Sequence, residues 1–107
     1  MRKGAEFEDR AVEYLRSLGY RIIKKNYHCR EGEIDIIAQK DNTVIFVEVK
    51  GGKSKSFGDP VERIDYRKLR RIIRCMEEYL CKNPAEDYRL EVVLVRGRDI
   101  EHFPVSL

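Results

Sequence analysis

The chain has 107 residues, of which 42% are hydrophobic and 38% charged, and its net charge is +3. This length suits one domain, residues 1–107, around a single core. No run is apolar and long enough to cross a membrane, and no apolar segment follows the basic N-terminus. We therefore expect a cytoplasmic protein without a membrane contact, whose mildly basic charge is compatible with nucleic acid.

The cysteines predict no metal site. There are three, Cys29, Cys75 and Cys81, which is an odd number, and none forms a C-x-x-C pair. We expect free thiols in a reducing cytoplasm.

Residues 4–18 show the spacing of an amphipathic helix that ends before Gly19. Its apolar face would hold Ala11, Val12, Leu15 and Leu18. Glu8 falls on the same face. It either reaches water at the end of the stripe or points into a site as an acid.

A strand over residues 20–27 follows, with Ile22 and Ile23 in the core, and then a polar loop over residues 26–31. His28 and Cys29 fall in that loop, and their proximity indicates no ligand pair.

Residues 32–50 hold the most informative pattern, two apolar runs separated by a short polar break. This pattern predicts a hairpin of central strands. If Asp41 and Asn42 form the turn, the register places Asp35 opposite Glu48, and Lys50 shares the face of Glu48 because side chains alternate along a strand. A slip by one residue would move Asp35 to the other face.

Two carboxylates facing each other repel unless a cation lies between them. Asp35 and Glu48 therefore predict a site for a hard divalent cation, Mg²⁺ or Mn²⁺. The alternative is a solvated face. The apolar strands favour the metal site, because unpaired acids within a central sheet are costly.

The residues after the hairpin are basic. Residues 51–58 predict a loop that leaves the sheet after Lys50, either a solvated connection or a phosphate-contacting flap carrying Lys53 and Lys55. Asp65 would cap a helix that runs to about Cys81. Its apolar face would comprise Leu69, Ile72, Ile73, Met76 and Leu80, and its basic stripe Arg67, Lys68, Arg70, Arg71 and Arg74. The stripe is either solvated surface or a contact with the phosphate backbone.

Two further strands close the chain. Residues 88–95 are apolar on both faces, which is typical of a strand covered on both sides. Residues 100–103 start an edge strand marked by Pro104, and His102 would lie at the surface or at the edge, with no partner that the sequence indicates. The element order predicts an α/β or α+β fold around a central mixed sheet of about five strands, flanked by helices.

The segments G-E-I-D and F-V-E-V-K, on adjacent central strands, resemble the PD-(D/E)xK or restriction-endonuclease-like superfamily. With F-E-D-R-A-V-E-Y-L, F-G-D-P and R-K-L-R-R-I, nearly the whole chain resembles the YraN family, which is similar to archaeal Holliday junction resolvases. The resemblance implies Glu8, Asp35 and Glu48 as acids of a nuclease site and Lys50 as its catalytic lysine. The chain departs from the family at Leu69, where relatives usually have Gln, and at Gly51-Gly52 and Glu91.

These observations lead to the hypothesis of metal-dependent phosphodiester hydrolysis of DNA, with RNA as a less favoured substrate. Asp35 and Glu48, the Val49 carbonyl and Glu8 would hold the metal, and Lys50 would orient or deprotonate water. Selective action on branched DNA would require a homodimer. The alternative is a non-catalytic nucleic-acid-binding or scaffold module that retains the nuclease fold.

Overall fold

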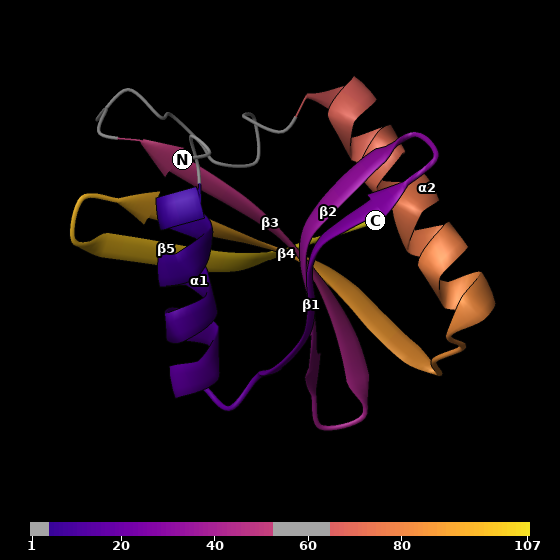
Figure 1. The fold of residues 1–107 in the computed structure, drawn as a ribbon, viewed down its shortest axis with the longest axis horizontal. Coiled ribbons are helices and arrows are strands. Elements are labelled where there is room, and N and C mark those ends of the chain that lie inside the picture. The colour runs from indigo at the N-terminus through magenta and orange to yellow at the C-terminus, as the bar shows by residue number, and fades with distance from the viewer. Residues whose placement is uncertain (1–4, 53–64) are drawn as a thin grey trace.

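The computed structural model describes residues 5–52 and 65–107. The elements follow in the order α1 (Ala5–Ser17), β1 (Arg21–Cys29), β2 (Gly32–Lys40), β3 (Thr43–Gly52), α2 (Tyr66–Lys82), β4 (Asp87–Arg96) and β5 (Asp99–Val105) (Figure 1). Within these ranges, neither helix has the length and apolar character needed to span a membrane.

The strands form one mixed sheet in the order β1-β2-β3-β4-β5. All neighbours are antiparallel except β3 and β4, which are parallel. Parallel neighbours need a crossover connection, and α2 lies between β3 and β4 in the chain. The predicted mixed sheet flanked by helices is confirmed, and it is consistent with a restriction-endonuclease-like core.

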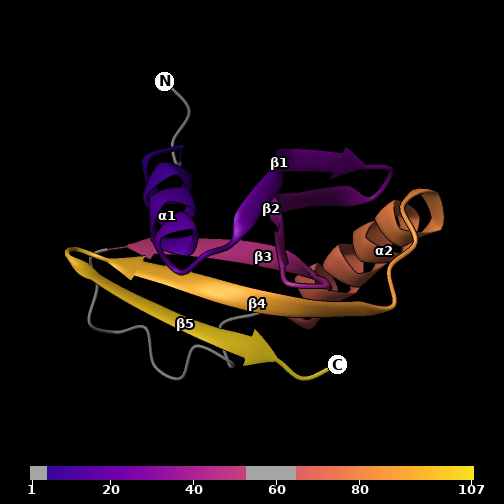
Figure 2. The same ribbon diagram turned by 90° about the horizontal axis from the view of Figure 1, so that it is seen from below.

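Each helix covers one face of the sheet, so that two cores form. On the α1 face, Leu15 packs with Ile36 and Val47; on the α2 face, Met76 packs with Ile37 and Phe46. Consecutive residues of β2 and β3 thus point to opposite cores, as strand alternation requires. Figure 2 shows the β1–β2 hairpin bending away from β3, β4 and β5 on the side of α2.

The C-terminal end of α1 and the N-terminal end of α2 form as the sequence predicts, but one residue predicted on the apolar face of α1 is exposed. Gly19 has φ of 91° just past the end of α1, where glycine is favoured. The Asp65 carboxylate accepts a 3.0 Å hydrogen bond from the Arg67 backbone N–H at the start of α2. The exception is Leu18, which is 42% exposed because α1 ends at Ser17 and Leu18 does not share its buried face.

The predicted loop over residues 26–31 is wrong. β1 continues to Cys29, and its partner β2 starts at Gly32, so only a two-residue turn separates the strands. The predicted core residue Ile23 is exposed, because the ladder shifts register between Ile22 and Lys24 on this edge strand. Tyr20 and Tyr27 are buried in its place.

The predicted exit of the chain after Lys50 is also wrong. Gly51 and Gly52 extend β3 and pair with Val95 and Arg96 of β4. The rest of the predicted basic loop, including Lys53 and Lys55, lies outside the described residues.

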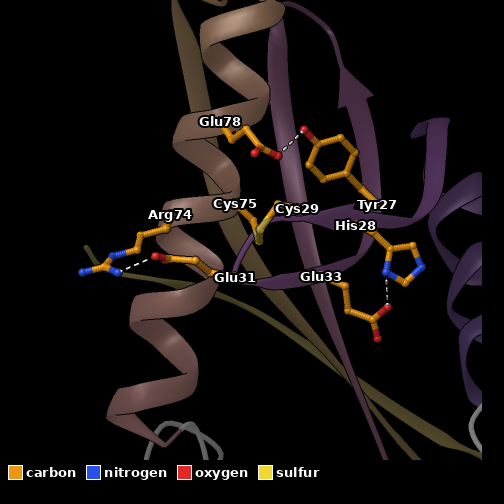
Figure 3. Close-up of a disulfide and its surroundings, with 8 residues drawn as sticks. All are labelled: Tyr27, His28, Cys29, Glu31, Glu33, Arg74, Cys75 and Glu78. Atoms are coloured by element: carbon orange, nitrogen blue, oxygen red, sulfur yellow. Dashed lines mark hydrogen bonds and ion pairs between the residues drawn. A yellow bond between two sulfur atoms is a disulfide. The ribbon is translucent and has the colours of Figure 1, made fainter.

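The expectation of free thiols is wrong for two of the cysteines. Cys29, at the end of β1, and Cys75, in α2, form a disulfide with a Cα–Cα distance of 5.5 Å (Figure 3). The bend of the β1–β2 hairpin toward α2 brings these residues together, although they are 46 positions apart. Cys81 is exposed and free.

His102 lies on the edge strand β5, one of the two places predicted for it, but its side chain is only 15% exposed and it has partners that the sequence did not indicate. Its Nε2 lies 2.6 Å from Glu91 Oε1, and its Nδ1 lies 3.2 Å from the Tyr14 hydroxyl. Glu91 also accepts a 2.9 Å hydrogen bond from the Tyr20 hydroxyl, and Arg89 forms an ion pair with its other oxygen. This network joins β5 to α1 and β4.

Candidate active site

The predicted register of the β2–β3 hairpin is confirmed. Lys40 pairs with Thr43, and the ladder continues in step to Ile36 and Val47. One step further along, the Asp35 carboxylate accepts a 2.8 Å hydrogen bond from the Val49 backbone N–H. The Asp35 side chain therefore crosses to β3 on the face that Glu48 also occupies.

Asp35 and Glu48 form a buried pair of acids, 9% and 4% exposed. Burial, followed by the close contact with Glu48 and the charge of Glu48, raises the pKa of Asp35 from 3.8 to about 8. The Val49 N–H opposes this rise without cancelling it. The pair consequently retains a proton at neutral pH when no metal ion is bound.

Lys68, near the start of α2, supplies a positive charge to this pair. Its Nζ lies 2.7 Å from Glu48 Oε2. Burial lowers the pKa of Lys68, but the close contact with Glu48 outweighs burial and the net pKa is raised. We predicted Lys68 as a phosphate contact. Its place beside Glu48 had no signal in the sequence, because it depends on how α2 docks on β3.

The contact with Lys68 leaves Glu48 incompletely satisfied. Glu48 Oε2 is fully buried, and within the described residues it has no hydrogen-bond partner of normal geometry, only the ion pair. A buried carboxylate oxygen without a hydrogen bond is costly. Together with the adjacent Asp35 it forms a donor set of the kind that hard divalent cations prefer. The residues therefore fit such a cation.

Lys50 lies on the same face and is half-buried. Burial, and then the positive charge of Lys68, lower its pKa below the ordinary value of 10.5. Glu48 and Asp35 act in the opposite direction without reversing the shift. Lys50 thus carries an amine that releases its proton more readily than an ordinary lysine.

Glu8, in the first turn of α1, lies at the periphery of the site. Its charge also raises the pKa of Asp35, but it contributes least among the causes. The preceding residue, Phe7, lies against Gly51 so closely that a Cβ at position 51 would overlap its ring. Glycine after Lys50 therefore lets the start of α1 approach the end of β3.

The number of acids at the site is limited. Across residues 5–52 and 65–107, no group of three or more His, Cys, Asp or Glu side chains is close enough to hold a metal ion. Asp35 and Glu48 are the carboxylates that the described chain brings together here, and the metal-binding roles of Asp35, Glu48, Glu8 and the Val49 carbonyl stay predictions.

The predicted basic stripe on α2 lines a groove beside the acids. Two pockets, of about 410 and 250 Å³, extend along the first turns of α2 and the β1–β2 turn. Both are lined by Glu31, Arg67 and Arg71. Lys68 lines the larger pocket, and Arg70 and Arg74 line the smaller one. The Arg74–Glu31 ion pair, at 2.7 Å, connects the two walls of the groove (Figure 3).

The family model and the similar proteins that match this chain all belong to one family, and each match covers most of the chain. The family model described as "Uncharacterised protein family UPF0102" matches residues 7–95. A UPF0102 protein of Sulfurihydrogenibium sp. is 43% identical over 102 residues, covering 94% of this chain and 89% of the relative. One from Persephonella marina is 43% identical over 102 residues, covering 94% and 88%. One from Thermotoga neapolitana is 41% identical over 97 residues, covering 90% and 89%.

These matches confirm the resemblance to the YraN family, and they cover all of the described site residues up to β4. The chain belongs to the protein family UPF0102.

Proposed function

We propose that this protein hydrolyses phosphodiester bonds of DNA with the help of a divalent metal ion. The observation that carries the proposal is the buried acid pair Asp35–Glu48, which shares one face with Lys50 and is linked through Lys68 to an arginine-lined groove. Strongly shifted pKa values at such a cluster are typical of functional sites.

Asp35 and Glu48 would hold the metal, aided by the Val49 carbonyl. When bound, a divalent ion polarises the scissile phosphate and lowers the pKa of water. Glu8, close enough to influence Asp35, would position a water molecule or extend the metal site.

Lys50 would orient or deprotonate the attacking water. Its lowered pKa makes the neutral amine more accessible near neutral pH than in an ordinary lysine, and a base must be deprotonated to act. In its charged form the same amine would stabilise the negative charge that develops on the phosphate.

The arginines of the groove would hold the nucleic acid by its phosphates. These contacts would come from arginines of one helix, and because phosphate contacts carry no sequence information, we expect binding without sequence preference. The arginines are Arg67, Arg70, Arg71 and Arg74. Lys53 and Lys55, predicted contacts outside the described residues, would add to this grip. Action on branched DNA would need two such sites and therefore a homodimer.

One observation favours the alternative, a non-catalytic nucleic-acid-binding module. Lys68 already pairs with Glu48, so part of the acidic charge is neutralised without a metal ion. In that case the groove would bind nucleic acid, and the acids would contribute only to the structure.

Cleavage assays distinguish the two functions. Labelled linear, flapped and four-way DNA, with single-stranded RNA for comparison, are incubated with Mg²⁺ or with a chelator. We expect Mg²⁺-dependent cleavage of DNA by the wild type and a loss of at least about 100-fold in D35N and K50A. D41N, which removes an exposed carboxylate from the other end of the same hairpin, should retain the activity.

Two results would argue against the proposal. Equal cleavage by wild type and D35N would assign the activity to a contaminant or another site. Binding without cleavage, by wild type and D35N alike, would favour the non-catalytic module.

A further inference from the structure

Lys68 occupies an unusual position for a residue on a nucleic-acid-binding surface. Its Nζ lies 2.7 Å from Glu48 Oε2, yet its side chain is 46% exposed and lines the larger groove pocket. The amine therefore contacts the buried acid while the rest of the side chain borders the groove. No other arginine or lysine of the described groove pairs with Glu48 or Asp35.

The contact oxygen is the one that the rest of the fold leaves unsatisfied. Glu48 Oε2 is buried and receives no hydrogen bond of normal geometry within the described chain. Asp35, by contrast, is fixed by the Val49 N–H. Glu48 Oε2 is therefore the acid-pair oxygen most in need of a cation, and it is the atom that Lys68 holds.

Charge makes the two contacts mutually exclusive. A divalent ion between Asp35 and Glu48 would lie beside two ammonium groups, Lys50 and Lys68, which already influence each other. Like charges a few ångströms apart repel strongly in a partly buried site. Lys50 is half-buried and lines neither groove pocket, whereas the side chain of Lys68 is 46% exposed and lines the larger pocket.

We propose that Lys68 is a resident cation that competes with the divalent ion for Glu48, and that the ion displaces it into the groove. The inference rests on the proposed function, and it adds a coupling between metal binding and phosphate binding. Without the ion, Lys68 neutralises the acids. With the ion bound, its ammonium group becomes available to a phosphate.

Metal affinity without nucleic acid tests the competition. K68M keeps most of the aliphatic side chain and removes the charge. Titration calorimetry with Ca²⁺ or Mg²⁺ at pH 9, where protons compete little for Asp35, should give a dissociation constant about tenfold (~1.4 kcal/mol) lower in K68M than in wild type. K68Q is the second variant should K68M not fold, as judged by circular dichroism.

R71M is the matched control, because it removes a positive charge from the same helix and groove without a contact to Glu48. We expect its dissociation constant to stay within about twofold of wild type, since screened charges interact weakly. An equal gain in R71M would assign the effect to net charge and overturn the inference.

The failures of this inference and of the proposed function are distinguishable. Ion binding that D35N abolishes but K68M leaves unchanged overturns the competition alone. Absence of binding in both wild type and K68M overturns the metal site and the competition together.

The salt dependence of DNA binding tests the displacement. With Ca²⁺ present, the slope of log K against log salt should be smaller in magnitude by about 0.9 in K68M than in wild type, the value of one phosphate contact. Without Ca²⁺ the two slopes should agree, because Lys68 is then held by Glu48. A difference that does not depend on Ca²⁺ would overturn the displacement.

Discussion

Two equally buried glutamates on neighbouring strands lie on opposite faces of the sheet and have different partners. Glu48 of β3 and Glu91 of β4 are each 4% exposed. Glu48 pairs with Val92 and Glu91 with Val47, so the two carboxylates are adjacent in register but lie on opposite faces. Glu48 faces α2 and Lys68, whereas Glu91 faces α1 and Tyr20.

The partners determine the charge state. Burial alone would raise the pKa of Glu91, but hydrogen bonds from His102 and Tyr20 outweigh it and lower that pKa. On the other face, Glu48 meets a second acid, and the pKa of Asp35 rises to about 8. Equal burial thus produces a hydrogen-bonded carboxylate with a lowered pKa on the α1 face and an acid pair with a raised pKa on the α2 face.

The largest effect should come from the disulfide, which belongs to the α2 face. Replacing both Cys29 and Cys75 by Ser removes a link across 46 positions, and we expect the free energy of unfolding to fall by ~4 kcal/mol. Urea denaturation measures this. The ring signals of His102 in NMR spectra should stay unchanged, because that network lies on the α1 face. Alkylation of all three cysteines in the unreduced wild type would contradict the prediction.

Replacing Glu91 should lower the free energy of unfolding more than replacing Glu48. E91L leaves the Tyr20 hydroxyl and the His102 ring without their partner, and we expect a loss of ~3 kcal/mol in the free energy of unfolding. E48L should change it by less than ~1 kcal/mol, because Lys68 can reach water and Asp35 loses a like-charged neighbour. Equal losses in urea denaturation would remove the distinction between the two faces.

The pH dependence of stability should have opposite signs on the two faces. Asp35 holds a proton in the folded state from its ordinary pKa of 3.8 up to about 8, whereas the unfolded chain has lost it. Raising the pH through this window therefore removes stability, by up to ~1.4 kcal/mol per pH unit. For Glu91, whose folded pKa is lowered below 4.5, stability is instead lost as the pH falls through the folded pKa.

Unfolding free energies of wild type, D35N and E91Q across this pH range measure both contributions. D35N should remove the decline above pH 4, and E91Q should flatten the acidic limb. Curves for D35N and wild type that run parallel would show that Asp35 titrates normally.

The smallest expected effect is a change in the salt dependence of DNA binding when arginines of α2 are replaced. R70A combined with R71A should weaken DNA binding and reduce the magnitude of its salt slope by about 2, because each arginine would neutralise about one phosphate. R16A, an exposed arginine on α1, is the control and should leave the slope unchanged. A reduction by R16A would place the interface on the α1 face, and an unchanged slope in R70A/R71A would exclude α2.

Local patterns were sufficient for the hairpin that carries the acids. The alternation in β2 and β3, together with the two-residue turn at Asp41, specifies the register, and the register specifies which side chains share a face. Asp65 was recognisable as a helix cap for a similar reason, since its partner is two residues away.

Contacts between distant segments were not predictable in this way. The disulfide, the His102–Glu91 contact and the Lys68–Glu48 ion pair each join residues from different elements. They depend on the bend of the β1–β2 hairpin and on the docking of α2 and β5 against the sheet. The sequence alone therefore determined that Asp35, Glu48 and Lys50 face one way, because strand periodicity is local. Only the tertiary structure decided which cation meets them, because that cation comes from a helix that packs on the sheet from elsewhere in the chain.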